Sequence, residues 1–200
     1  QFGLFSYAQS FVGLFTAIAT LGLDGIVVRE LVKDESRRDE LIGTAFWLNI
    51  LGALGVLIVL AIAINFTSND SYTSSLVFII ASATIFQSFN VVDMYFQSKV
   101  LSKYIVYANV ISLFISSIVK ITLILNEAPL IAFAWVILFD SFILASGFIY
   151  FYLKNRHHSE QSDRHSVLDT ESSFTWEFNK STALSLLKDS WPLILSGIFI

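Results

Sequence analysis

The chain has 200 residues, of which 55% are hydrophobic and only 14% are charged, and its net charge at pH 7 is −4. Soluble domains carry about 25% charged residues, so this composition excludes an ordinary cytosolic enzyme, and the negative charge argues against a nucleic-acid binder. The chain contains no cysteine, which excludes disulfides, zinc–thiolate sites and thiol nucleophiles within it. The composition is that of a membrane protein.

Five long apolar stretches follow one another, at about residues 7–28, 44–66, 76–97, 104–125 and 130–153. Each is long enough to cross a hydrocarbon core of about 30 Å as a helix. Backbone polar groups in lipid must be satisfied internally, and no barrel-like alternation is present, so we expect an all-α, polytopic transmembrane helix bundle. Residues 154–190 are expected to form a cytoplasmic linker with an interfacial segment. Residues 191–200 are expected to begin a further span, with Pro192 in its first turn.

Lysine and arginine are distributed unequally between alternate loops. Eleven of the 12 lie between the first two spans, between the third and fourth, or after the fifth, whereas Lys120 lies inside a span. The positive-inside rule places the basic loops in the cytoplasm. The sequence starts at Gln1 and stops within an apolar run, so we expect further protein at both ends.

Polar side chains form a stripe along one face of three of the five predicted helices. On a helical projection they fall within about 80° on the first and fourth spans and within about 120° on the third. They are Gln9, Thr16, Thr20 and Asp24; Gln87, Asn90, Asp93 and Gln97; and Asn109, Ser112, Ser116 and Lys120. Asp140 adds an ionisable group near the middle of the fifth span.

Two interpretations of these stripes compete. Hydroxyl and amide side chains often join neighbouring helices by hydrogen bonds. This role is enough to explain the presence of Ser112 and Ser116. Ionisable groups at membrane depth are costly and usually mark an aqueous pathway or a proton relay. This better explains the four ionisable groups within the spans, namely Asp24, Asp93, Lys120 and Asp140. We therefore expect a water-filled cavity, and we expect Lys120 and Asp140, on successive helices, to form an ion pair.

Motifs for enzymatic chemistry are missing from the sequence. It has no glycine-rich phosphate loop, no His-Glu-x-x-His zinc pattern and no Gly-x-Ser-x-Gly elbow. The acidic pairs of the first basic loop adjoin Arg37 and Arg38 and are interpreted as solvated ion pairs. We expect no catalytic residue, no cofactor and no metal site.

Four segments carry a resemblance to a known family. They read Phe-Gly-Leu-Phe-Ser-Tyr-Ala at 2–8, Ala-Thr-Leu-Gly-Leu-Asp-Gly-Ile-Val-Val-Arg-Glu-Leu at 19–31, Arg-Asp-Glu-Leu-Ile-Gly-Thr-Ala at 38–45, and Leu-Lys-Asp-Ser-Trp-Pro-Leu-Ile-Leu-Ser-Gly at 187–197. With these segments in this order along the chain, the sequence resembles bacterial polysaccharide flippases of the O-antigen type, which belong to the multidrug/oligosaccharidyl-lipid/polysaccharide exporter superfamily.

The resemblance implies a fold and a function. It implies two six-helix halves that alternate access to a central cavity, with residues 1–200 spanning the second helix to the start of the seventh, so that they represent the N-terminal half. The implied activity is translocation of undecaprenyl-pyrophosphate-linked oligosaccharide across the bacterial inner membrane. Membrane lipids and glycan assembly proteins are further implied partners, and no nucleic acid is expected.

The resemblance also implies roles for three groups of side chains at the cavity. They are the cations Lys120 and Arg29, which would attract the phosphate groups; the amides Gln87, Asn90 and Asn109, which would hydrogen-bond sugar hydroxyls or water; and the acids Asp24, Asp93 and Asp140, any of which would bind a coupling cation or proton.

Three alternatives remain open from the sequence. A drug or cation antiporter of the same superfamily would use the acids rather than Lys120 for transport. A polytopic membrane glycosyltransferase, glycan polymerase or ligase would need a large outer loop with acids or arginine, whereas the short outer loops carry only Asp70 and Glu127. A scaffold helix bundle would tolerate alanine at Asp93, Lys120 and Asp140.

Overall fold

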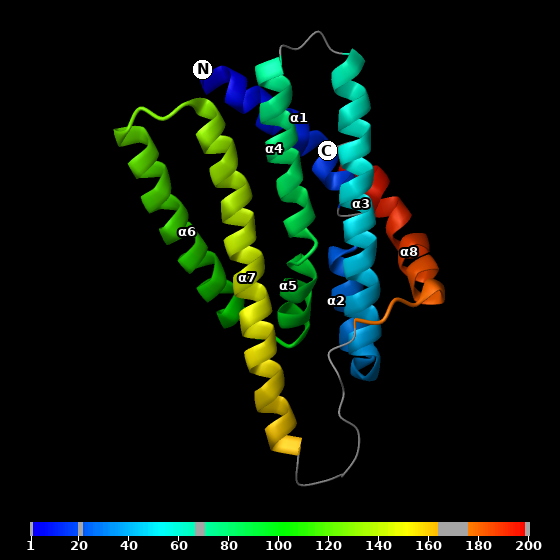
Figure 1. Cartoon of the computed structure of the whole chain (residues 1–200). Helices are drawn as coiled ribbons and strands as arrows, with labels where there is room; N and C mark the ends of the chain where they lie inside the picture. The colour runs from blue at the N-terminus through cyan, green and yellow to red at the C-terminus, as the bar shows by residue number, and fades with distance from the viewer. Residues whose placement is uncertain (1, 20–21, 67–70, 164–175, 199–200) are drawn as a thin grey trace.

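The computed structural model describes residues 2–19, 22–66, 71–163 and 176–198, and these residues form eight α-helices and one short 3-10 helix, η1 (Figure 1). The elements are α1 (Phe2–Ala19), α2 (Asp24–Lys33), η1 (Glu35–Arg37), α3 (Arg38–Phe66), α4 (Ser71–Gln87), α5 (Asn90–Ser98), α6 (Ser102–Leu125), α7 (Leu130–Asp163) and α8 (Lys180–Ile198). No strand occurs in this described part. The predicted all-α polytopic helix bundle is confirmed.

Four helical stretches among the described residues are long and apolar enough to cross a membrane. They are Glu35–Phe66, Ser71–Ser98, Ser102–Leu125 and Leu130–Asn155. They overlap the last four of the five predicted spans. Residues 164–175 of the predicted linker, residues 199–200 of the predicted further span, and Thr20 of the first polar stripe lie outside the described residues.

The helices pack around two apolar clusters. One cluster joins α2, the start of α3, α5, the end of α7 and α8, and includes the fully buried Phe96 and Leu23. The other joins α1, the end of α3, α4 and the start of α7, and includes the fully buried Leu60 and Leu76. Figure 1 shows α6 and α7 side by side at one edge of the bundle, whereas α8 lies beside α3 at the other.

The charged loops gather at one end of this bundle. The connections from α2 to α3 and from α5 to α6, and the end of α7, lie together at the bottom of Figure 1. We call this the basic end because residues 29–38 and 99–103 and Lys154 lie there.

The predicted first span at 7–28 is not one continuous helix. α1 ends at Ala19 and α2 begins at Asp24, and Gly22 between them has φ of 60°. This left-handed conformation is open to glycine at no steric cost. Leu23 is fully buried, and its carbonyl accepts from Ile26 N at 3.1 Å and from Val27 N at 2.9 Å, so tertiary packing anchors the new start.

The predicted span at 76–97 is also interrupted. α4 ends at Gln87 and α5 begins at Asn90. At the break, Ser88 N and Phe89 N bond to carbonyls three residues back, at 3.2 and 3.1 Å, which is 3-10 geometry. The ring of Phe89 lies 5.0 Å from that of Phe46 on α3. The break therefore lies where α3 packs against α4 and α5.

The expectation that Pro192 occupies the first turn of a helix is wrong. α8 begins at Lys180, and Pro192 lies well inside it. The helix begins earlier because Asn179 caps it: Asn179 Oδ1 accepts from Ser181 N at 2.9 Å. Amides of the first turn have no partner within the helix, so such a cap stabilises this start.

Candidate functional site

Lys120 and Asp140 face each other across the packed helices α6 and α7. Lys120 Nζ lies 3.8 Å from Asp140 Oδ2, and Ser112 Oγ donates to Asp140 Oδ1 at 2.7 Å. The predicted ion pair is confirmed. The two charged side chains are 43% and 30% exposed, so they lie at the margin of the helix contact rather than sealed within it.

Small residues allow α6 and α7 to approach closely enough for this pairing. Ser112 and Ser116 are buried on the α6 face. Nearer the basic end, a Cβ added to Gly147 would lie 3.4 Å from Ala108 Cβ. Such residues are typical of helix contacts in membranes, so the two serines serve packing, as expected, while the charged pair lies beside them.

Asp24 and Asp93 are brought together by the packing of α2 against α5. Their carboxylates lie near enough to interact electrostatically, and like charges repel. Asp93 Oδ1 accepts from Gln97 Nε2 at 3.0 Å, one turn further along α5. Asp24 is exposed and Asp93 half-buried, so two partly accessible acids lie on neighbouring helices.

The three predicted amides occupy two different places. Gln87 and Asn90 are half-buried and flank the break between α4 and α5. Asn109 is exposed on α6, and its Nδ2 donates to Ile105 O of its own helix at 2.9 Å. Only Gln87 and Asn90 therefore lie beside an interruption of the backbone.

Arg29 lies at the basic end and is already paired. Its Nη2 lies 3.0 Å from Glu30 Oε1 and 3.0 Å from Asp189 Oδ2 on α8. Lys33 Nζ also reaches Glu30, at 2.8 Å. Hydrogen bonds from Lys33 and then Arg29 hold the pKa of the Glu30 carboxyl below its usual range.

The structure separates the two predicted phosphate-binding cations. α6 starts at the basic end with Ser102, and at 1.5 Å per residue Lys120 lies about 27 Å along the helix from that start. Arg29 lies at the basic end itself. Lys120 and Arg29 are therefore at opposite ends of the bundle and do not form one joint cradle.

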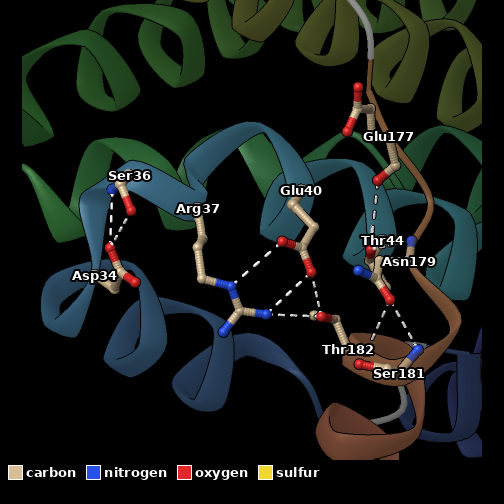
Figure 2. Close-up of polar contacts among 9 residues, drawn as sticks. All are labelled: Asp34, Ser36, Arg37, Glu40, Thr44, Glu177, Asn179, Ser181 and Thr182. Carbon is tan, nitrogen blue, oxygen red and sulfur yellow. Dashed lines mark hydrogen bonds and ion pairs between the residues drawn. The ribbon is translucent and has the colours of Figure 1, made fainter.

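Sequence reasoning missed a set of polar contacts between the start of α3 and the start of α8, drawn in Figure 2, which we call the α3–α8 contact. Thr44 Oγ1 accepts from Asn179 N at 3.1 Å and donates to Glu177 O at 3.4 Å. Arg37 Nη2 lies 3.0 Å from Glu40 Oε1 and donates to Thr182 Oγ1 at 2.8 Å. The Thr182 hydroxyl in turn donates to Glu40.

Gly43 allows the two backbones of the α3–α8 contact to touch. A Cβ at this position would lie 2.7 Å from both Glu177 N and Glu177 O. Beside it, the Trp176 ring lies 4.3 Å from that of Phe46. The capping sequence at Asn179 and the glycine near the start of an apolar helix are local signals, but neither identifies its partner more than 130 residues away.

Comparison with protein families gives a match over the whole chain. A family model described as polysaccharide biosynthesis protein matches residues 1–200. In comparisons with curated proteins and with solved structures, nothing matched the chain.

Proposed function

Because this chain belongs to the polysaccharide biosynthesis protein family, we propose that it forms part of a flippase for undecaprenyl-pyrophosphate-linked oligosaccharide. The membership supports a role in polysaccharide synthesis or export by a membrane protein. The proposal is that the protein translocates this lipid across the bacterial inner membrane and that its basic end faces the cytoplasm. Alternating access around a hydrated cavity is the proposed mechanism, and no catalytic role is assigned.

The half-exposed Lys120–Asp140 pair carries the proposal. Charges within membrane-spanning segments are costly and usually face a cavity or the interior of a bundle. A pair that served only to join α6 and α7 would be expected to be buried between them, whereas these side chains are 43% and 30% exposed. We infer that they line the hydrated cavity.

The geometry suggests how Lys120 would act on a phosphate. Ser112 holds Asp140 at 2.7 Å, whereas the Lys120 ammonium is 3.8 Å from the other carboxylate oxygen. The carboxylate is thus fixed, and the ammonium, on a flexible four-carbon stem, is free to turn toward an anion. Asp140 then compensates the lysine charge when no substrate is bound.

The other residues predicted to contact the substrate would act at other steps of its passage through the protein. Arg29 would meet the pyrophosphate at the basic end by exchanging Asp189 or Glu30 for it, and Lys120 would meet it later, deeper in the bundle. Gln87 and Asn90, the half-buried amides beside the interrupted helix, would hydrogen-bond sugar hydroxyls.

The test uses the full-length protein in bacteria whose own flippase gene is deleted, with surface polysaccharide as the readout. We expect Lys120→Ala and Asp140→Ala to lower it at least tenfold at equal protein level. Ile118→Ala, which changes an exposed apolar side chain of the same helix, is expected to have no effect. If both charge variants supported normal polysaccharide, the flippase proposal would be contradicted and a scaffold role favoured.

A second candidate, a cation antiporter, is favoured by the Asp24–Asp93 pair. Two like charges held together gain from binding a proton or a monovalent cation between them. In this case Asp93→Asn would abolish efflux of an organic cation such as ethidium from cells, while surface polysaccharide would not depend on the protein. The flippase proposal predicts the opposite dependence.

A further inference from the structure

Two lysines at the basic end are joined by a continuous row of aromatic rings across α6 and α7. Lys103 Nζ lies 5.0 Å from the centre of the Tyr104 ring, and Lys154 Nζ lies 5.9 Å from that of Tyr150. Between them, Phe151 is 5.6 Å from Tyr104 and 5.4 Å from Tyr150, centre to centre. We call these five residues the lysine–aromatic row.

Among the side chains that the structure describes, the two lysines of this row have no carboxylate partner, unlike the other cations at the basic end. Five other cations there each form an ion pair with a carboxylate, namely Arg29, Lys33, Arg37, Arg38 and Lys99. For Lys103 and Lys154, no ion pair occurs within the described part of the chain. α6 contains no acidic residue, and the acid of α7 whose side chain the structure describes, Asp140, is about 21 Å along the helix from Lys154 at 1.5 Å per residue.

An exposed apolar face begins at the same lysine. Tyr107, Val110 and Phe114 follow Lys103 at intervals of four, three and four residues and are 57%, 56% and 69% exposed. At 100° per residue the four side chains lie within about 60° of one another on α6. The surface thus combines cations and tyrosines at one end with an apolar stripe leading away, the pattern of a membrane–water interface.

We propose that the lysine–aromatic row binds the headgroups of anionic glycerophospholipids. A lipid phosphate contacts the ammonium of Lys103 or Lys154, and an acyl chain lies along the Tyr107, Val110 and Phe114 face. Basic sites between transmembrane helices recognise anionic headgroups in this way. The cations on the α2–α3 side are less suited to binding a lipid phosphate, since they already form ion pairs with carboxylates. The inference requires only that the chain spans a membrane, so it is independent of the transported substrate.

The expected loss of lipid affinity follows from the number of lysine charges removed. A lysine near an anionic membrane surface contributes about 1 kcal/mol, which is about fivefold in affinity. Losing one lysine should therefore weaken anionic lipid binding about fivefold, and losing both about 25-fold. Binding of a zwitterionic lipid should change little.

The experiment titrates the purified full-length protein in detergent with dioleoylphosphatidylglycerol or dioleoylphosphatidylcholine and follows the bound lipid by native mass spectrometry. Lys103→Gln with Lys154→Gln is expected to remove the preference for phosphatidylglycerol. The matched control is Lys180→Gln with Lys188→Gln, which removes two exposed cations of α8 and should leave the preference intact. Lys103→Arg with Lys154→Arg should also retain it.

Two results would overturn the proposal. One is an equal loss of preference in both double glutamine variants, which would mean that net charge alone governs binding. The other is an unchanged preference in the variant that lacks the lysines of the row. Glycerol 1-phosphate at the lipid concentration should not displace phosphatidylglycerol; displacement would show that phosphate alone suffices and would contradict the role of the apolar face.

Discussion

Substituting Gly43 by alanine should disrupt the α3–α8 contact. The new methyl group would lie 2.7 Å from backbone atoms of Glu177, and backbone cannot turn aside as a flexible side chain can. Overpacking of this kind costs about 1–3 kcal/mol. If the segment moves away instead, the two hydrogen bonds of Thr44 are lost, at about 1 kcal/mol each. Alanine gains about 1 kcal/mol in helix propensity, so we expect a net loss of up to about 2 kcal/mol.

Gly55 provides a matched control on the same helix. A Cβ at Gly55 meets nothing within 4 Å, so Gly55→Ala should stabilise the protein by about 0.5–1 kcal/mol. The assay combines the thermal unfolding midpoint in detergent with amide hydrogen exchange of residues 176–183. Gly43→Ala should lower the midpoint or accelerate exchange at Asn179, whose amide donates to Thr44. If both alanine variants shifted the midpoint upward and exchange at Asn179 stayed slow, the close backbone approach would be refuted.

Two further predictions concern local conformation and pH. Val100 has φ of 57°, a conformation that costs a β-branched residue about 1–2 kcal/mol. Val100→Gly should therefore raise the thermal unfolding midpoint, whereas the control Val106→Gly, within α6, should lower it. A lower midpoint for Val100→Gly than for Val106→Gly would contradict this. The Glu30 carboxyl has a lowered pKa, so its contribution to stability is present above the ordinary value of about 4.3 and is lost as the pH falls through its folded-state pKa. Glu30→Gln should therefore show a smaller drop in midpoint from pH 7 to pH 3.5 than the unsubstituted protein, and equal drops would count against the assigned hydrogen bonds.

Hydropathy and charge predicted much of this molecule because both are local properties of the sequence. The helical class and the membrane-spanning character follow from long apolar runs, and the family resemblance carried by four short segments is confirmed by the family match over residues 1–200. The Lys120–Asp140 pair was also predictable, since a charge at membrane depth needs a partner and successive helices tend to be neighbours.

The features that were missed depend on tertiary contacts. The break near Gly22 interrupts an apolar run without proline, and it is fixed by the burial of Leu23. The break at Ser88 similarly depends on packing against α3. The hydrogen bonds of Thr44 join segments far apart in sequence, and no periodicity reveals such a pairing. The separation of Lys120 from Arg29 also depends on the fold, because it follows from the length of α6 only once α6 is known to start at the basic end.

The central claim, that the Lys120–Asp140 pair lines a hydrated cavity within the membrane, is tested most directly by thiol accessibility at Lys120, with Asp93 as a second ionisable position, in the full-length protein. These 200 residues contain no cysteine, so single cysteines can be introduced into this part at positions 93, 118 and 120. Ile118 lies two residues from Lys120, at nearly the same depth, but about 160° away around α6. With a membrane-impermeant methanethiosulfonate reagent applied to both faces of membrane vesicles, the account predicts rapid modification of Asp93→Cys and Lys120→Cys and slow modification of Ile118→Cys. Protection of positions 93 and 120 to the same degree as position 118 would contradict it.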